Sequence, residues 1–106
     1  MDKVQRRRDI WKKTGGRCAH CGKMAAAHDQ TIDHYIPRSW GGTFDRRNLM
    51  PLCRECNWER KAQEINPAKF YKYAPAHIIA ACRSYEKAFN RNYCAYYSMA
   101  DAEMAM

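Results

Sequence analysis

The residues best suited to chemistry are four cysteines in two pairs and an Asp-His dipeptide between the pairs. Both cysteine pairs have two residues between the thiols, and the dipeptide is Asp33-His34. Two such pairs can bind one Zn²⁺ through four thiolates in a tetrahedral site. The ligands expected for this structural zinc are Cys18, Cys21, Cys53 and Cys56. The zinc would then hold in place a segment that carries a carboxylate beside an imidazole.

A carboxylate, an imidazole and an amide oxygen can together supply what the hydrolysis of a phosphodiester requires. The reaction requires a deprotonated water and a positive charge near the phosphate and the leaving oxygen. A neutral histidine is a suitable base at pH 7, so we expect His34 to activate the water. Mg²⁺ takes one or two protein oxygens and completes its shell with water and phosphate. Asp33 and Asn57 can supply those two oxygens.

The Asp-His dipeptide on its own is weak evidence for an active site. Such a pair is more often a surface carboxylate beside a structural histidine, and only its place between the two cysteine pairs favours chemistry. In a regular strand Asp33 and His34 would also point to opposite faces. They can serve one site if the strand ends early, as Pro37 allows, or if a metal-bound water and a phosphate bridge the gap.

The elements that must position these groups are predicted from glycine, proline and hydrophobic spacing. The expected order is a basic helix over 2–14, an extended segment over 23–36, a loop over 38–48, a strand over 49–52, a helix over 54–65 and further helix over 67–93. Pro51 favours an edge position or an irregular ribbon for the second strand.

Helical spacing divides the 54–65 segment into two faces. Asn57 and Lys61 recur at i and i+4, which predicts that they share a face open to a substrate. Trp58, Ala62 and Ile65 recur at i, i+4 and i+7 on another face. We expect this second face to be the buried one.

Composition indicates a small basic protein with a polyanionic partner. The chain has 106 residues and a net charge of +8, which favours nucleic acid over a merely soluble surface. It has no long apolar run and no signal-peptide pattern, so we expect no membrane association and a cytoplasmic location. Thiols stay reduced there, and the repeated spacing favours zinc over disulfides or a redox pair. Cys82 and Cys94 lack such spacing and are expected to be packed or free thiols.

The segment from Cys18 to Lys61 resembles the HNH endonucleases, also called ββα-metal or His-Me finger nucleases. The resemblance covers roughly residues 17–63 and rests on motifs in the family's order. These motifs are Asp33-His34, Pro37-x-Ser39-x-Gly41-Gly42, Asn48-Leu49 and Cys53-x-x-Cys56-Asn57-x-x-x-Lys61. The resemblance implies an α+β fold with a small zinc-stapled ββα core, flanked by N- and C-terminal helices.

The family resemblance also implies a role for each motif residue. His34 would be the general base, and Asp33 and Asn57 the ligands of the catalytic metal. Asn48 would be the middle Asn, whose side chain bonds across the ββ loop and holds the backbone near His34. Many members have His where this chain has Asn57. We interpret that difference as a preference for Mg²⁺ or Mn²⁺ rather than a loss of activity.

These inferences predict a metal-dependent DNA endonuclease that nicks one strand per active site. We expect one domain over 1–106: a basic helix over 1–16, the zinc core over 17–65 and a helical extension over 66–106. Double-stranded DNA would be held through its backbone, by a monomer or a dimer. Candidate phosphate contacts are Arg38, Arg46, Arg47, Arg60 and Lys61.

Two other functions fit part of the sequence. A non-catalytic, zinc-ribbon-like nucleic-acid-binding module explains the charge and the cysteines but leaves Asp33-His34, Asn48 and Asn57 unexplained. A protein-interaction adaptor would use the tyrosine-rich C-terminal half, which can dock on the core or on a partner protein. By family analogy alone, the setting would be a bacterial or phage-infected cell, in genome packaging, element mobility or attack on a rival genome.

Overall fold

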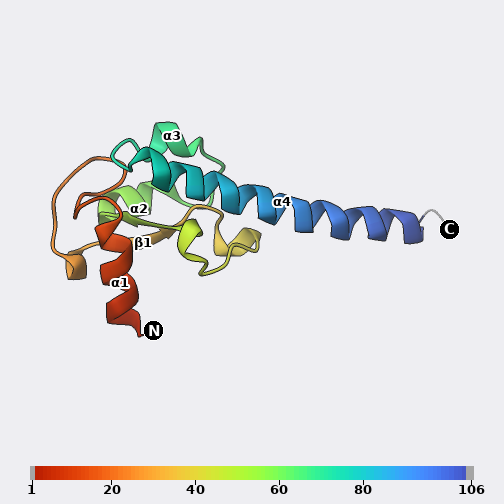
Figure 1. Ribbon diagram of the computed structural model, residues 1–106, viewed down its shortest axis with the longest axis horizontal. Coiled ribbons are helices and arrows are strands. Elements are labelled where there is room, and N and C mark those ends of the chain that lie inside the picture. Colours follow the sequence, from red (N-terminus) through yellow and green to blue (C-terminus); the bar gives the residue numbers. More distant parts are fainter. Residues whose placement is uncertain (1, 105–106) are drawn as a thin grey trace.

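The computed structural model describes residues 2–104 and the side chains of residues 2–90. Helices and short 3₁₀ turns surround one two-stranded sheet (Figure 1). In chain order the elements are α1 (Lys3–Lys12), η1 (Ala27–Asp29), β1 (Thr31–His34), η2 (Arg38–Trp40), η3 (Arg46–Asn48), β2 (Leu49–Leu52), α2 (Arg54–Arg60), α3 (Pro67–Phe70) and α4 (Ala76–Met104). This arrangement confirms the predicted α+β class.

The sheet brings the two motif-bearing strands together. β1 and β2 are antiparallel, with Asp33 opposite Met50 and His34 opposite Leu49. Pro51 lies in β2 opposite Ile32, where the two-stranded sheet has only edges, so its missing N–H does not break a central ladder. The extended segment predicted over 23–36 is shorter as a strand, because η1 occupies part of it.

The loop between the strands is shaped by a pair of glycines. The amide of Gly42 donates to the Pro37 carbonyl at 3.0 Å, which folds the loop back on itself. A Cβ atom on Gly42 would lie 1.7 Å from the Ile36 carbonyl oxygen, so only glycine fits there. Gly41 has a φ of 96°, in the left-handed region that favours glycine. The Gly-Gly motif therefore sets the path of the chain just after His34.

The predicted helix over 54–65 is too long, and its predicted buried face is wrong. α2 ends at Arg60, because Lys61 adopts a φ of 54° that no α-helix can continue. Trp58 is 80% exposed. The helix instead buries Cys56 and Arg60, which are four residues apart and share a face.

The C-terminal helical segment is interrupted once. α3 ends at Phe70, and α4 begins at Ala76 directly after Pro75, whose carbonyl accepts from the amides of Ile78 and Ile79. A proline just before a helix satisfies the geometry of its first turn. α4 then runs past the rest of the molecule (Figure 1).

The core lies between the sheet and the C-terminal segment. Leu49, Met50 and Leu52 of β2 are fully buried, and Tyr71 and Cys82 pack in the same cluster. Tyr71 and Tyr85 thus dock the C-terminal half on the core, whereas Tyr93, Tyr96, Tyr97 and Cys94 lie beyond the described side chains. Within the described residues, no helix is long and apolar enough to cross a membrane.

Candidate active site

Four cysteine thiols converge beside the sheet. The sulfur atoms of Cys18, Cys21, Cys53 and Cys56 all lie within 4.8 Å of one another. The Sγ atoms of Cys21 and Cys53 are 3.9 Å apart. A tetrahedral Zn²⁺ with Zn–S bonds of about 2.3 Å places its sulfurs about 3.8 Å apart, so the cluster fits zinc. Burial raises the pKa of the Cys53 and Cys56 thiols, and a cation would favour their thiolate forms.

Backbone hydrogen bonds hold the first cysteine pair against the sheet. The amide of Ala19 donates to the Pro51 carbonyl at 2.9 Å, which joins the first pair to β2 directly before the second. The Ala19 carbonyl accepts from the Tyr73 amide at 3.0 Å. A Cβ atom on Gly22 would lie 2.6 Å from the Tyr73 ring, so glycine allows this close packing. The cysteine cluster is therefore tied to both the sheet and the C-terminal segment.

An open groove of about 190 Å³ brings the three predicted chemical groups to one place. Its lining includes Asp33 and His34 from β1 and Asn57 from α2. Arg38, Arg60 and Lys61 line the same groove. Asp33 and His34 are adjacent at the end of β1, and both line the groove.

Asp33 is the more buried member of the dipeptide, with 5% of its surface exposed. Its Oδ2 accepts a hydrogen bond of 2.6 Å from the Tyr71 hydroxyl and lies 3.2 Å from Arg60 Nε. Burial raises the pKa of Asp33 to about 6, against the lowering effects of Arg60 and of the Tyr71 hydrogen bond. The carboxyl group is thus largely ionised at pH 7 and can still offer its Oδ1 atom to a cation.

His34 is half-buried and its imidazole is neutral at pH 7. Burial lowers its pKa below the ordinary 6.5, and the charges of Arg38 and Arg60 lower it further. The ring packs edge-on against Phe44 with a centroid distance of 4.8 Å. Its Nε2 atom is buried and has no hydrogen-bond partner among the described residues. Nδ1 is therefore the nitrogen available to a water in the groove.

The Asn57 side chain has one end anchored. Its Nδ2 donates a 2.7 Å hydrogen bond to the hydroxyl of Thr31, at the start of β1. This contact orients the amide so that Oδ1 is left as an acceptor. Asp33 and Asn57 together provide one charged and one neutral oxygen on the groove, a donor set suited to Mg²⁺ or Mn²⁺.

Asn48 is fully buried and bridges the two sides of the ββ loop. Its Oδ1 accepts from the Ile36 amide at 2.7 Å, and its Nδ2 donates to the carbonyls of Ile36 and Thr43 at 3.1 and 2.9 Å. Its backbone carbonyl accepts from the Tyr35 amide at 2.7 Å. Three of these hydrogen bonds fix the chain directly after His34, and the fourth ties it to the far side of the loop.

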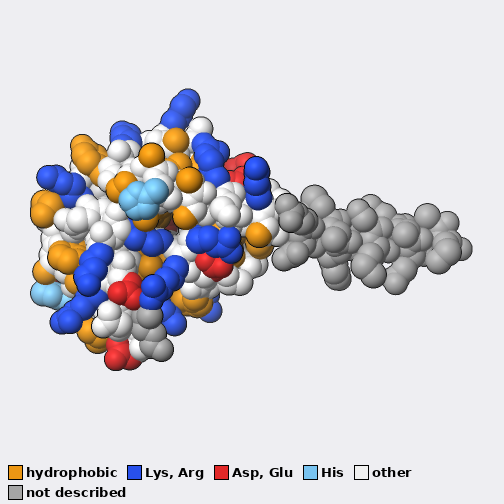
Figure 2. Space-filling model, viewed as in Figure 1, with side chains coloured by type: hydrophobic (Ala, Val, Ile, Leu, Met, Phe, Trp, Pro, Cys, Tyr) orange, Lys and Arg blue, Asp and Glu red, His pale blue; other side chains and the backbone are white. Residues whose placement is uncertain are grey.

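Four of the five basic residues predicted to contact phosphate lie at the surface, two of them at the groove and two in ion pairs. Arg38 and Lys61 are exposed at the groove. Arg46 pairs with Asp9 at 2.7 Å, and Arg47 with Asp45 at 2.8 Å. Lys and Arg side chains are spread over the face of the molecule seen in Figure 2, where acidic side chains are few.

Arg60 does not fit its predicted phosphate contact. It is 2% exposed, and its guanidinium donates to the carbonyls of Tyr35 and Lys61 while its Nε lies beside Asp33. The sequence contained a signal for this placement. Cys56 must face the cysteine cluster, so the residue four positions on must face inward as well.

Two aromatic residues at the site were not predicted to be there. Tyr71 bonds Asp33 across 38 positions of sequence, and Phe44 packs on His34. Arg6 of α1 and Arg38 both place their guanidinium carbon about 5 Å from the Phe44 ring centroid, at 4.9 and 5.0 Å. These contacts depend on how distant segments pack, and no local pattern reports that.

Comparison with known proteins places these features in a wider group. The sequence profile of the HNH endonucleases matches residues 18–71, just over half of the chain. The CRISPR-associated endonuclease Cas9 of Corynebacterium diphtheriae is 33% identical over 57 residues, and that of Actinomyces naeslundii is 35% identical over 52. Each match covers 48% of this chain and 5% of the relative, so the chain spans about 5% of the length of these relatives.

A solved structure shares the fold. The crystal structure of the Type II-C Cas9 enzyme from Actinomyces naeslundii superposes with a TM-score of 0.53 and 26% sequence identity. The match covers 59% of this chain and 7% of that one. The similarity therefore concerns a small nuclease-like unit within a much larger protein.

Proposed function

The chain belongs to the HNH endonuclease family, and from that premise we propose that it hydrolyses DNA phosphodiester bonds with His34 as general base. A divalent cation, Mg²⁺ or Mn²⁺, would be held by Asp33 and Asn57. The single observation that carries this proposal is the groove that all three side chains line, with Oδ1 of Asp33, Oδ1 of Asn57 and Nδ1 of His34 not used in any hydrogen bond described above.

His34 acts on the attacking water. Its lowered pKa keeps the imidazole neutral at pH 7, so Nδ1 can accept the proton as the water attacks phosphorus. Phe44 restricts the ring from one side, and three hydrogen bonds of Asn48 fix the backbone that follows. The cation would supply positive charge to the phosphate and the departing 3′ oxygen. Asn48 thus contributes by positioning the base.

The basic rim binds the DNA backbone in this proposal. Arg38 and Lys61 are the contacts best placed at the groove, and Arg46 and Arg47 lie on the same loop as Arg38, where their present partners are the acidic Asp9 and Asp45. Such contacts position double-stranded DNA without reading its sequence. One groove per chain then cuts one strand, so a monomer nicks, and a double-strand break needs a dimer or two events.

We also propose that the chain acts as one domain in three parts, 1–16, 17–65 and 66–106. Burial of Ile10, Leu52 and Tyr71 supports this division into interdependent parts. The zinc in the cysteine cluster is structural in this account. The cation at Asp33 and Asn57 is the catalytic one.

Digestion of supercoiled plasmid tests the proposal. Zinc-loaded protein with Mg²⁺ should convert supercoiled plasmid into nicked circles, and the same zinc-loaded protein without added Mg²⁺ or Mn²⁺ should leave the plasmid supercoiled. Retarded but uncut plasmid at every Mg²⁺ and Mn²⁺ concentration would instead identify the non-catalytic binding module.

A further inference from the structure

The carboxylate of Asp33 has two oxygens in different situations. Oδ2 accepts from the Tyr71 hydroxyl at 2.6 Å and lies 3.2 Å from Arg60 Nε. Oδ1 has no hydrogen bond from the described residues. A carboxylate this buried needs compensation for its lost hydration, and all of the observed compensation is directed to one oxygen.

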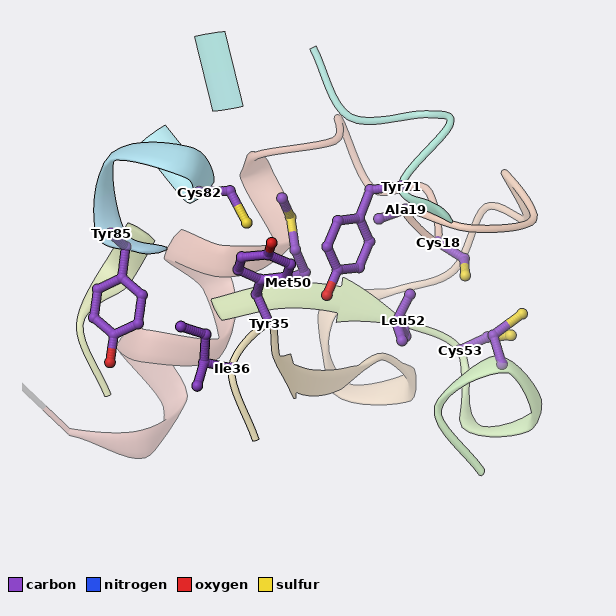
Figure 3. Close-up of a cluster of buried hydrophobic side chains, with 11 residues drawn as sticks. Cys18, Ala19, Tyr35, Ile36, Met50, Leu52, Cys53, Tyr71, Cys82 and Tyr85 are labelled. Atoms are coloured by element: carbon purple, nitrogen blue, oxygen red, sulfur yellow. The ribbon is translucent and has the colours of Figure 1, made fainter. Parts of the chain in front are cut away.

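Tyr71 is held rigidly where it meets Asp33. The residue is 1% exposed, and its ring lies beside Tyr35 and Met50 with the hydroxyl directed toward the sheet (Figure 3). Its amide donates to the Pro67 carbonyl at 2.9 Å, and its own carbonyl accepts from Ala74 at 3.1 Å. Burial and these backbone bonds hold Tyr71 in the position where its hydroxyl meets Asp33.

Arg60 is fixed in the same way from the other side. Its Nη2 donates to the Tyr35 carbonyl at 2.7 Å, and its Nη1 donates to the Lys61 carbonyl at 3.0 Å. These two bonds set the plane of the guanidinium beside Asp33. Because the group is 2% exposed, its charge acts on the carboxylate with little screening by solvent.

We propose that Tyr71 and Arg60 are positioning residues, which hold Oδ2 of Asp33 so that Oδ1 is presented to the divalent cation in the groove. The inference rests on the proposed function, in which Asp33 is a ligand of that cation. Hydrogen bonds to the outer oxygen of a carboxylate ligand orient the ligand, and their loss typically costs 10- to 100-fold in metal affinity. The cation site then depends on the segment between α3 and α4, outside the ββα core itself.

The test compares two buried tyrosines that each bond a carboxylate. Tyr71→Phe removes the hydroxyl on Asp33, and Tyr35→Phe removes the hydroxyl that donates to Glu86 on α4. Both variants carry His34→Ala so that a bound duplex stays intact. Electron paramagnetic resonance measures Mn²⁺ binding to the zinc-loaded protein–DNA complex, after subtraction of binding to DNA alone. The Mn²⁺ concentration for half-maximal cleavage is measured separately with His34 present.

The expected result is a selective loss of metal affinity. Tyr71→Phe should weaken Mn²⁺ binding about tenfold and raise the half-maximal concentration equally, with the rate at saturating Mn²⁺ nearly kept. Tyr35→Phe should match the parent in both measurements. Arg60→Lys, which keeps a charge but loses the fixed guanidinium plane, should also weaken Mn²⁺ binding.

One outcome would overturn the positioning role of Tyr71 and Arg60, and a different outcome would overturn Asp33 as a metal ligand. If every folded variant of Tyr71 and Arg60 binds Mn²⁺ like its parent, the two residues serve the fold alone, and the proposed function is untouched. If Asp33→Ala leaves Mn²⁺ binding unchanged, the metal assignment in the proposed function is itself wrong. Zinc content and cooperative unfolding identify the folded variants.

Discussion

The protonation of His34 is controlled by its immediate surroundings. Burial disfavours the imidazolium, and the positive charges of Arg38 and Arg60 disfavour it further, so the pKa lies below 6.5. A general base works only in its neutral form. Cleavage at saturating metal should therefore persist at pH values where an ordinary histidine is already protonated.

Arg38→Ala should move the acid limb of the pH–rate profile to higher pH. Removing a positive charge near the imidazole stabilises its protonated form, so the pKa of His34 rises toward 6.5 and more activity is lost at low pH. The measurement is the single-turnover rate at saturating DNA and metal from pH 5 to 8. Arg83 lies on α4, and its exposed guanidinium donates to Asn66. Arg83→Ala should leave the acid limb of the pH–rate profile in place. An acid limb that is the same in both variants would contradict this origin of the pKa.

That three residues would meet at one place was easier to predict from the sequence than the side chains that surround them. Asp33, His34 and Asn57 do line one groove. The partners that tune them, Tyr71 and Phe44, come from segments whose packing depends on the whole fold. Spacing along the chain therefore predicted which groups meet, and tertiary contacts decide what surrounds them.

Among the elements, the cysteine cluster joins the loop before the sheet to the start of α2. The first cysteine pair lies in a loop, and the second lies at the start of α2, a helix of seven residues. Helices this short are unstable alone in water. A structural zinc contributes on the order of 10 kcal/mol to folding, which is comparable to the whole stability of a small domain.

Cys53→Ala should unfold the domain, because it removes one of the four thiols that would hold the zinc. Circular dichroism and zinc content measure the result. Cys82→Ala is the matched control: the residue is equally buried but outside the cluster, so zinc should stay at one ion per chain. A soluble, folded and zinc-free Cys53→Ala protein would refute the structural role.

β2 was predicted more accurately than the end of α2. β1 contains the β-branched residues Thr31 and Ile32, and β2 has the predicted bounds of 49–52. The predicted extension of α2 to residue 65 failed because apolar periodicity continued past Lys61, although the backbone turns there. The break before α4 was marked in the sequence by Pro75, which the continuous helical prediction over 67–93 ignored.

In the whole molecule, the N-terminal helix reaches the aromatic ring that packs on His34. Arg6 of α1 and Arg38 of η2 share the Phe44 ring, and the same ring packs on His34. Together with the net charge of +8, this contact makes α1 an extension of the basic surface beside the site. The bulk charge predicted a polyanionic partner, but it could not place that charge on one side of a groove.

Arg6→Ala should weaken DNA binding equally for all sequences and lower the salt dependence. Each phosphate contact contributes about 0.9 to the slope of log affinity against log salt concentration, so the slope should fall by about one. Fluorescence anisotropy with the His34→Ala background over a range of salt concentrations gives the slope. Arg83→Ala is the charge-matched comparison on α4. An equal fall in both slopes would mean that only net charge matters, and α1 would have no specific contact.

Cleavage by His34→Ala, measured beside the wild-type protein, shows directly whether the His34 imidazole activates the attacking water. Both proteins are loaded with zinc, shown to unfold at similar temperatures and incubated with supercoiled plasmid and Mg²⁺. The wild-type protein should produce nicked circles, and the variant should leave the plasmid supercoiled while still binding it. A folded His34→Ala protein that nicks at the wild-type rate would show that this imidazole does not activate the water.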